Sequence, residues 1–566
     1  MTPPGPTAIE SSVREEVQGI LLRAVERVVR EVDAGQLDQL PALQLGSPKL
    51  PEHGDFASNA ALGLAGPLRI PPREVAERIV RAIEDPEGLL DRVEIAGPGF
   101  VNFFLAQTRW HEVLTRVLLD AEQYGRSNAG GGEPTLVEFV SANPTGPLTI
   151  GHGRNAILGD CIARLLEATG SKVTREYYFN NAGRQMRILA ESLRARYLQA
   201  LGESADLPEE GYQGSYLVET ARDLVGEQGD SLRDAEWPVF QQAAEKAIFA
   251  NIRSTLDRLG IRFDVFFNEN SLYEGGLVER ALEDLRNAER VYEQDGAVWL
   301  RSTDAGFERD RVLVKSSGEP TYLLPDIAYH REKLRRGFQR LVDVLGADHL
   351  EQFPYVRAAT AHLGFDADRI EAVYYQWVNL RRGSEVVKMS TRSGSFVTVD
   401  EVLDEVDVDV FRYFMVDRRA DTHLDFDLAL AHERSERNPV YKIQYAHARL
   451  CSIERLATER GATFPPPEEV PAQRLSLPEE IELIKSVGRF PEVVLRAART
   501  REPYDVARYL LDLATEFHTY ISDGRRHRVL ADDPELQAAR LALVRGIRIV
   551  LANGLGLLRI QAPERM

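Results

Sequence analysis

Apolar residues recur at helical spacing near the start of the chain and then give way to an alternating, strand-like pattern. The first periodic stretch predicts a helix over about residues 9–33, with a capping-box pattern at its start. A second amphipathic helix is expected over Glu74–Ile83, followed by a strand over Gly99–Leu105. Because the turn-rich stretch Asn128–Pro134 comes next, we expect an N-terminal α/β domain over residues 1–127.

Beyond this boundary, strand patterns alternate with helix patterns, which is typical of a doubly wound parallel sheet. The predicted elements are a strand at Thr135–Val140, a helix at Arg154–Thr169, and further strands at Val173–Phe179, Leu341–Leu345 and Ala372–Val378. We expect this domain to extend over residues 128–432. An acidic, glycine-rich stretch at about 203–237 is interpreted as an insertion on its surface.

The rest of the chain, residues 433–566, is almost entirely helical in pattern and predicts a C-terminal helical bundle. A proline-rich linker at 464–478 interrupts it. One amphipathic helix has Val506 and Tyr520 on the same face and is expected to end at Gly524. The pattern alone does not distinguish a simple bundle from one that binds RNA.

Composition narrows the class of protein. With 566 residues and a hydrophobic share of 43%, the chain should fold as several soluble domains, and no apolar run approaches the ~20 residues that span a bilayer. The first residues do not have the pattern of a signal peptide, so a cytoplasmic protein without membrane association is expected. Two cysteines far apart, Cys161 and Cys451, give no framework for a structural metal.

Charge gives two further indications. A net charge of −19 argues against a protein that coats nucleic acid nonspecifically, although a local basic face is still compatible with it. The chain has only eight lysines, so a lysine within a candidate site is unusually informative. The basic cluster at 331–340 is interpreted as an ordinary solvated helix face.

The segment Glu138–Ala156 combines a buried strand, a turn and a helix. The turn contains Asn143 and Pro144, and Gly151-His152-Gly153 precedes the predicted helix. Glycines and a helix N-terminus at the carboxyl end of a strand suit a phosphate, and His152 could donate a hydrogen bond to it. A tight strand-to-helix connection with a surface histidine is an equally good interpretation of this segment alone.

A second segment, 385–396, reads EVVKMSTRSGSF. Lys388, Ser390 and Arg392 are donors suited to a pyrophosphate leaving group, with Met389 and Thr391 between them. A solvated basic turn is the alternative.

Together the two segments resemble the HIGH and KMSKS signatures of class I aminoacyl-tRNA synthetases. Several other stretches are similar to the arginyl-tRNA synthetase family, so the resemblance covers essentially the whole chain. These stretches are Gly54-Asp55, Gly97–Asn102, Glu138–His152, Val312–His330, Gly346–His349, Val440–Ile453 and Ala562–Met566.

The resemblance implies an N-terminal domain that contacts the tRNA elbow, a Rossmann-type catalytic domain and a C-terminal domain that reads the anticodon. It implies a monomeric arginine–tRNA ligase that uses ATP with Mg²⁺ to form arginyl-adenylate and then charges tRNA(Arg). In this family, activation usually also requires bound tRNA. Two alternatives are a catalytically impaired, synthetase-like tRNA-binding protein and another class I adenylating enzyme.

The resemblance also assigns residues. The catalytic set would be Thr149, His152, Lys388, Ser390 and Arg392, and ATP would contact Pro144, Gly151, His152, Gly153, Lys388, Met389, Ser390 and Thr391. L-Arginine would contact Glu138, Ser141, Asn143, Tyr322, Asp326 and His349. The tRNA would contact Asn102, Gln107, Tyr441 and Tyr445.

The arginine pocket can be tested against chemistry, because a guanidinium needs carboxylates and a flat partner. From the sequence alone, Asp326 could instead cap the helix that runs to Arg336, and Tyr322 could be a core aromatic. Tyr441 and Tyr445 could likewise belong to the core.

Two signature residues depart from the family pattern. Thr149 stands where the first histidine of HIGH is expected, and Thr391 replaces the second lysine of KMSKS. Arg392, Arg154 or Lys315 is a candidate to supply the missing positive charge.

Overall fold

A five-stranded parallel sheet forms the centre of the computed structural model, which describes residues 13–33, 43, 45–46, 48, 50–382, 385–386 and 397–566. Its order is β12 (Ile370–Tyr375), β11 (Arg340–Gly346), β5 (Pro134–Glu138), β6 (Lys172–Phe179) and β7 (Val265–Asn268). The strand that comes first in the chain, β5, lies in the middle. The direction of winding therefore reverses between β5 and β11, where doubly wound folds bind ligands beyond the carboxyl ends of the strands.

Helix α5 (Ile150–Ala168) follows β5 and is buried along most of its length. It packs so closely on the end of β5 that a Cβ at Gly159 would come within 2.2 Å of the Phe139 ring. Gly153 is restricted in the same way, by Phe411 and Val399. These contacts fix the N-terminus of α5 beside the carboxyl edge of the sheet.

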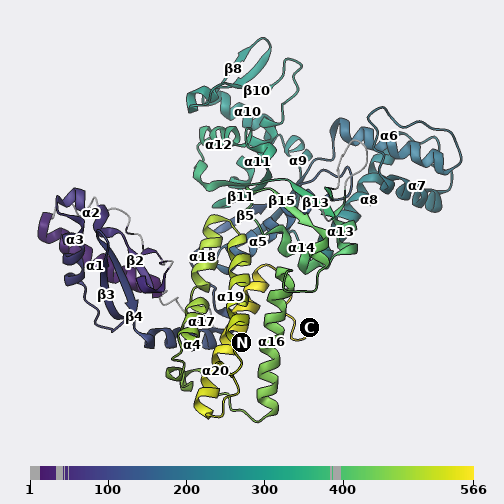
Figure 1. Ribbon diagram of the computed structural model, residues 1–566. Helices are drawn as coiled ribbons and strands as arrows, with labels where there is room; N and C mark the ends of the chain where they lie inside the picture. Colours follow the sequence, from purple (N-terminus) through teal and green to yellow (C-terminus); the bar gives the residue numbers. More distant parts are fainter. Residues whose placement is uncertain are drawn as a thin grey trace, which may run out of the picture.

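Two units extend from this sheet (Figure 1). The segment between β6 and β7 forms α6 (Gly183–Ala200), α7 (Ser215–Gln228) and α8 (Trp237–Arg258), so the expected acidic insertion is part of a larger helical unit. A second unit contains α9 (Asn270–Glu274), α10 (Leu277–Asn287), α11 (Leu323–Arg335), α12 (Phe353–His362) and the antiparallel strands β8 (Val291–Gln294), β9 (Ala297–Leu300) and β10 (Arg311–Val314).

The strand expected at Ala372–Val378 is two strands in the structure. β12 ends at Tyr375, and Val378 begins β13 (Val378–Arg382), which belongs to a separate sheet with β14 (Glu385–Val386) and β15 (Leu424–Asp427). The chain leaves the first sheet because the Gln376 N–H bonds to the carbonyl of Ala420 and the Trp377 carbonyl accepts from Leu424. Helices α13 (Val399–Glu405), α14 (Val408–Met415) and α15 (Leu428–His432) complete this part.

The N-terminal part has α1 (Val13–Asp33), α2 (Ala60–Leu68) and α3 (Pro72–Ala82) on a four-stranded sheet. Its order is β1 (Leu45–Gly46), β2 (Phe56–Ser58), β4 (Phe100–Leu105) and β3 (Leu90–Ala96). The start of the first predicted helix, residues 9–12, lies outside the described residues.

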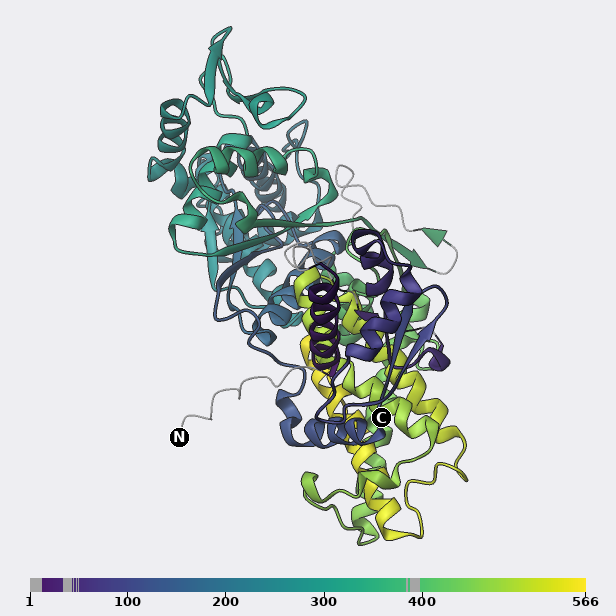
Figure 2. The ribbon, with the colours of Figure 1, turned by 90° about the vertical axis from the view of Figure 1, so that its left-hand side faces the viewer.

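The C-terminal helices are α16 (Pro439–Glu459), α17 (Pro478–Gly488), α18 (Phe490–Thr500), α19 (Tyr504–Ser522) and α20 (Pro534–Leu557). Helix α4 (Gln107–Asp120) leaves the N-terminal sheet and lies against them (Figures 1 and 2). There, Asn553 on α20 donates to the carbonyls of Ala121 and Tyr124. The prediction of α/β domains joined to an all-α domain is confirmed. No described helix is long and apolar enough to cross a membrane.

Candidate active site

The turn that leaves β5 is strained. Val140 and Ser141 have φ angles of 66° and 43°, in the left-handed region that β-branched residues in particular avoid. Such residues cost about 1 to 3 kcal/mol each and persist where the surroundings hold them. Here the Val140 N–H donates to Asn155 Oδ1 at 2.6 Å, and the Tyr178 N–H donates to Ser141 Oγ at 3.2 Å. These two bonds hold the strained turn at the carboxyl edge of the sheet.

A buried ionic network lies directly behind this turn. Glu138 accepts from the Ser141 hydroxyl at 2.9 Å and from the ammonium of Lys333, which also bonds to Asp343. His330 continues the network, with Nε2 at 3.1 Å from Asp343. Lys333 is fully buried. Burial alone would lower the pKa of Lys333, but Asp343 and Glu138 outweigh it and raise that pKa.

The basic cluster at 331–340 is therefore not a solvated face. Arg331 and Lys333 are buried, and Arg336 makes a bidentate pair with buried Glu176 at 2.5 and 2.7 Å. The cluster lies at the end of α11, which packs on the sheet, so Lys333 and Arg336 neutralise carboxylates that the strands carry. Arg331 pairs instead with Asp284 of α10, and Arg335 is exposed.

The residues expected to hold a guanidinium lie on α11 and around it. Asp326 is in the first turn of α11 but does not cap it, because the cap position is occupied by Tyr322. Tyr322 is 83% exposed, so it is not a core aromatic. Burial raises the pKa of Asp326 to about 7, and the negative charges of Glu138 and Glu269 add to that rise. The site thus gathers carboxylates in excess of cations, which suits a cationic ligand.

Three further residues lie around Asp326 and were not among the predicted site residues. Gln352 donates to Asp326 Oδ2 at 3.1 Å. The Tyr178 hydroxyl donates to Glu269 at 2.8 Å, and burial raises the pKa of Glu269. His349, by contrast, is exposed, and its Nε2 lies 3.8 Å from Asp348. Asn143 is exposed too, and its side-chain Oδ1 accepts from the Asn180 N–H at 3.0 Å.

At the N-terminus of α5, Thr149 and His152 form one unit. Thr149 is the N-cap residue, and its backbone N–H donates to His152 Nδ1 at 3.1 Å. Nδ1 is thus an acceptor, so the ring proton of the neutral imidazole lies on Nε2. Burial lowers the pKa of His152 to about 4, which keeps the ring neutral at pH 7. His152 is therefore prepared to donate one hydrogen bond from Nε2.

The flanking glycines have different surroundings. The atom nearest to a Cβ built at Gly151 would be the Thr149 hydroxyl oxygen, at 3.8 Å, so this side of the helix end is open to a ligand. Gly153 is buried against Phe411 of α14 and Val399 of α13, and Pro144 in the turn is also buried. Close packing therefore explains why residue 153 is a glycine.

The chain that follows the second signature is anchored near the first. Lys388, Met389, Ser390, Thr391 and Arg392 lie outside the described residues. Further along the chain, the Val397 carbonyl accepts from the Ile150 N–H at 3.1 Å, and the Val399 N–H donates to the Leu148 carbonyl at 2.8 Å. These two bonds place the chain that follows the second signature against the first turn of α5.

Arg154 has a role different from the predicted one. Its guanidinium is fully buried and donates to the carbonyls of Gln376, Thr422 and Arg419 at 2.7, 2.8 and 2.9 Å. It is committed to the backbone and does not face the open end of α5. Lys315, the other described candidate for the missing charge, follows β10 and lies 3.4 Å from Glu319.

The residues expected to contact tRNA differ in accessibility. Asn102 is buried in β4, and the Gln107 amide donates to the Leu475 carbonyl at 3.2 Å. Tyr441 and Tyr445 are half-buried and stack at 5.9 Å between ring centres, and His518 on α19 extends the stack at 5.7 Å. Aromatic rings stacked at a surface in this way can stack with nucleic-acid bases, whereas rings in the core could not reach them.

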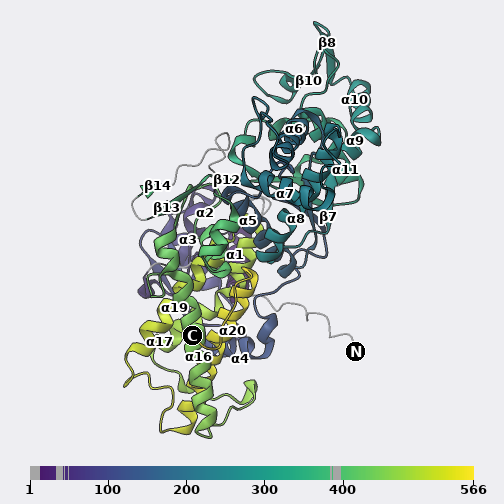
Figure 3. The same cartoon turned by 90° about the vertical axis from the view of Figure 1, so that its right-hand side faces the viewer.

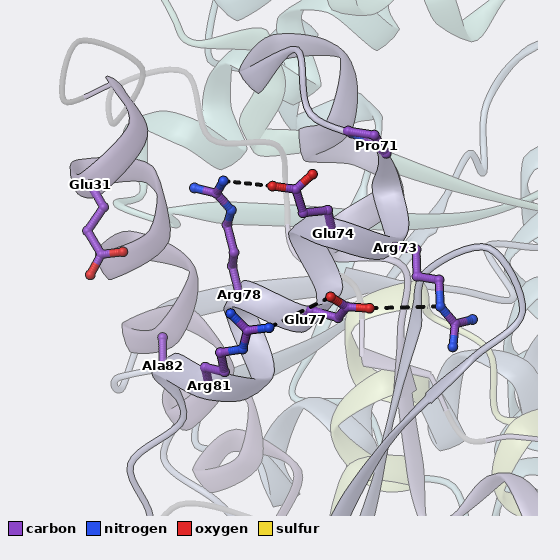
Figure 4. A pocket seen from close by; sticks show the side chains of 8 residues that line it. All are labelled: Glu31, Pro71, Arg73, Glu74, Glu77, Arg78, Arg81 and Ala82. Carbon is purple, nitrogen blue, oxygen red and sulfur yellow. Dashed lines mark hydrogen bonds and ion pairs between the residues drawn. The ribbon is translucent and has the colours of Figure 1, made fainter.

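A hollow of about 780 Å³ on the N-terminal part is distinct from this site. Figure 4 shows its arginines paired with carboxylates: Arg78 with Glu74 at 2.7 Å, and Arg73 and Arg81 with Glu77 at 3.9 and 3.8 Å. Within the part of the chain that the structure describes, no group of three or more His, Cys, Asp or Glu side chains is arranged to hold a metal ion.

Comparisons with known proteins agree with this geometry. Residues 9–105 match the family model for the arginyl tRNA synthetase N terminal domain, and residues 443–566 match the DALR anticodon binding domain. Residues 113–412, more than half of the chain, match the class I (R) tRNA synthetase catalytic domain. The chain belongs to the arginyl-tRNA synthetase family.

Relatives and solved structures of the family cover nearly the full chain. The arginine–tRNA ligase of Desulfotalea psychrophila is 49% identical over 525 residues, which is 92% of this chain and 94% of that protein. That of Syntrophotalea carbinolica is 46% identical over 531 residues, with 93% and 95% covered. The Thermus thermophilus arginyl-tRNA synthetase structure superposes with a TM-score of 0.76 at 25% identity and covers 98% of this chain and 100% of its own.

Proposed function

We propose that this protein is an ATP-dependent arginine–tRNA ligase, which activates L-arginine as arginyl-adenylate and transfers it to the 3′-terminal adenosine of tRNA(Arg). Membership of the family supports the activity. The structural observation that carries it is the pairing of Leu148 and Ile150 with Val399 and Val397. That pairing brings the chain that follows the second segment against the first one, at the edge of the sheet where we place the arginine site.

Arginine recognition follows from the pocket. Asp326 and Glu269 pair with the guanidinium, whose planar fork fits two carboxylates, and exposed Tyr322 covers its flat face. Ser141 and Asn143 are next to the amino-acid head, and Glu138 orients Ser141 through their 2.9 Å bond. His349 lies at the pocket rim. A lysine ammonium would leave part of this polar pocket unpaired, which supports selectivity.

The first chemical step needs stabilisation of phosphate charge. A carboxylate oxygen of arginine attacks the α-phosphorus of ATP, the bond to the bridging oxygen breaks, and pyrophosphate leaves with the electron pair. Gly151 admits the nucleotide, His152 donates from Nε2, and Thr149 holds that imidazole in place. Lys388, Ser390 and Arg392 bind the leaving group, with Met389 and Thr391 in the same segment. Mg²⁺ enters with the phosphates of ATP, since it keeps most of its waters in such sites.

The second step transfers the arginyl group to the terminal ribose of the tRNA. We assign residues 1–127 to the tRNA elbow, 128–432 to catalysis and 433–566 to the anticodon, with Tyr441 and Tyr445 as stacking partners for bases. Asn102 and Gln107 belong to the elbow side. The protein works as a cytoplasmic monomer.

The decisive experiment is arginine-dependent exchange between ATP and pyrophosphate in the presence of tRNA(Arg). We expect exchange with arginine and not with lysine, and we expect Asp326→Asn to raise the KM for arginine by about 100-fold, because a buried charge-assisted contact is lost. The KM for ATP should stay within about twofold, because the nucleotide does not contact Asp326.

Other outcomes identify the alternatives. Exchange with a different amino acid would make the chain another adenylating enzyme. Binding of tRNA(Arg) without exchange by any amino acid would make it a synthetase-like tRNA-binding protein.

A further inference from the structure

The helical unit inserted between β6 and β7 reaches the turn that precedes α5. Tyr216, the second residue of α7, donates its hydroxyl to the backbone carbonyl of Thr145 at 2.6 Å. Its ring also lies against Gly146, where an added Cβ would come within 3.3 Å of the phenol oxygen. The Tyr212 phenol lies close to the Thr145 side chain, so two phenols of the inserted unit lie against one residue of the turn.

The turn connects the two halves of the proposed site. At its start are Ser141 and Asn143, which we assign to arginine, and at its end is the N-terminus of α5. Residues of the sheet hold its first half, where Tyr177 donates to the Ala142 carbonyl at 2.8 Å and the Asn180 N–H donates to Asn143. Beyond Asn143 the bond from Tyr216 holds the backbone, and it comes from outside the sheet.

The inserted unit is itself anchored where it meets the turn. The Tyr212 N–H donates to Ser192 Oγ at 3.0 Å, which ties the segment before α7 to α6. Glu210 pairs with Arg184 of the first turn of α6 at 2.7 Å, and Gly211 fits closely against Pro208 and Ser192. Tyr216 is therefore presented from a fixed position, and burial raises the pKa of its hydroxyl, which remains a donor at any working pH.

We propose that Tyr216 is a positioning residue for ATP, and that through it the inserted helical unit forms part of the nucleotide site. The proposal rests on the assignment of the α5 N-terminus to ATP. The physical reason is that the Thr145 carbonyl fixes the direction of the chain that leads to Thr149 and Gly151. Small displacements of groups that align reacting phosphates reduce rate strongly. A role in packing alone would affect stability and leave the kinetics of the nucleotide unchanged.

The test compares two Tyr→Phe variants that each remove one phenol hydroxyl. Tyr216→Phe removes the bond to the turn. Tyr197→Phe is the control, because Tyr197 lies in the same inserted unit and its hydroxyl donates to the Gly229 carbonyl at 2.6 Å and accepts from the Leu232 N–H at 3.3 Å, both away from the turn. Both variants keep the ring and its packing, so both are expected to fold, which thermal unfolding of the full chain checks.

For Tyr216→Phe we expect the KM for ATP in arginine-dependent exchange to rise by about 3- to 10-fold, the range for loss of one hydrogen bond. The KM for arginine should change by less than about twofold, because Tyr177 and Asn180 still hold the arginine side of the turn. Tyr197→Phe should match the wild type in both constants.

An unchanged KM for ATP in Tyr216→Phe overturns the proposal, as does an equal change in both variants. A wild-type protein without arginine-dependent exchange would instead refute the proposed function, so the two failures are distinguishable.

Discussion

At the scale of single residues, Asp326 has the most informative environment. A buried carboxyl beside Glu138 and Glu269 resists ionisation, and its pKa is raised to about 7. A bound guanidinium would reverse this, because an opposite charge favours the carboxylate. Arginine binding should therefore compete with a proton at Asp326.

The sign of the pH dependence follows from that competition. Below pH 7 the free protein holds a proton on Asp326 that arginine must displace, so the dissociation constant for arginine should be about tenfold larger at pH 6 than at pH 8. Above pH 7.5 it should level off. Equilibrium dialysis with labelled arginine over this range measures it.

Two controls accompany this measurement. Asp417 also has a pKa raised by burial, to about 6, but faces Arg418 and Arg508, so Asp417→Asn should leave the profile unchanged. The dissociation constant of ATP should vary little over the same range, because His152, with a pKa of about 4, remains neutral. Arginine binding that is constant from pH 6 to pH 8 would contradict the role of Asp326.

Single residues also show what the sequence could predict of the site. The family resemblance implied Glu138, Ser141, Tyr322 and Asp326; the structure bonds Ser141 to Glu138, brings Glu138 close enough to Asp326 to raise its pKa, and leaves Tyr322 exposed at the start of α11. Glu269 was not predictable, because it follows β7 and reaches the pocket only through strand order. Lys333 had a signal, since it is one of eight lysines, but its basic neighbours suggested solvent; only the packing of α11 on the sheet turns it inward.

At the scale of elements, helix α5 organises both signatures. Its N-terminus presents Gly151 and His152, and Arg154, directly after them, holds the carbonyls of Gln376, Arg419 and Thr422. Gln376 precedes β13, which leads to the second signature. Arg154 thus fixes the segments that precede β13 and β15 relative to α5, by three bonds from one planar group, which a lysine ammonium at the end of a flexible stem could not reproduce.

Arg154→Lys separates this role from a direct charge on ATP. If Arg154 supplied positive charge to the nucleotide, lysine would preserve most of the activity. Because the guanidinium geometry is what matters here, we expect the variant to lose about 2 to 4 kcal/mol of stability and to show at least a 10-fold lower rate of exchange. Chemical denaturation and exchange kinetics measure the two effects.

Arg164→Lys is the matched control on the same helix. Arg164 pairs with Asp160 at 2.9 Å and keeps some exposure, so lysine can retain that pair and the exchange rate should stay near that of the wild type. Wild-type exchange in Arg154→Lys would restore the charge hypothesis.

Periodicity predicted the long helices well, because burial on one face decides their extent. The helix expected to end at Gly524 is α19, which ends at Ser522. The pattern failed at Ala372–Val378, where an unbroken apolar run covers the end of one strand and the start of another. Hydrogen bonds to Ala420 and Leu424, which are far away in the sequence, divide this apolar run into two strands. A local sequence pattern contains no information about such bonds.

At the scale of the whole molecule, Arg412 joins three parts of the chain. Its buried guanidinium donates to Asp160 on α5, to the Leu259 carbonyl after α8 and to the Leu558 carbonyl after α20, at 2.6, 2.9 and 2.9 Å. The catalytic helix, the inserted unit and the C-terminal helices thus meet at one side chain. Figures 1 and 3 show where the corresponding elements α5, α8 and α20 lie. The charging of tRNA, which uses both the anticodon and the acceptor end, depends on how these three parts are placed.

Arg412→Lys should therefore affect the assembled reaction more than its separate binding steps. One ammonium can keep the pair with Asp160 but not both carbonyls, so the three parts gain freedom relative to one another. We expect the turnover of tRNA charging to fall by at least about 10-fold, while the dissociation constants for arginine and tRNA stay within about twofold, because each binding surface is intact. Single-turnover charging and filter binding measure these quantities.

Arg419→Lys is the control, since Arg419 also spans two parts but its side chain makes only an exposed 3.7 Å pair with Glu502, which contributes little. Equal losses in both variants, or a parallel loss of binding in Arg412→Lys, would show that Arg412 serves stability alone and does not set the placement of the parts.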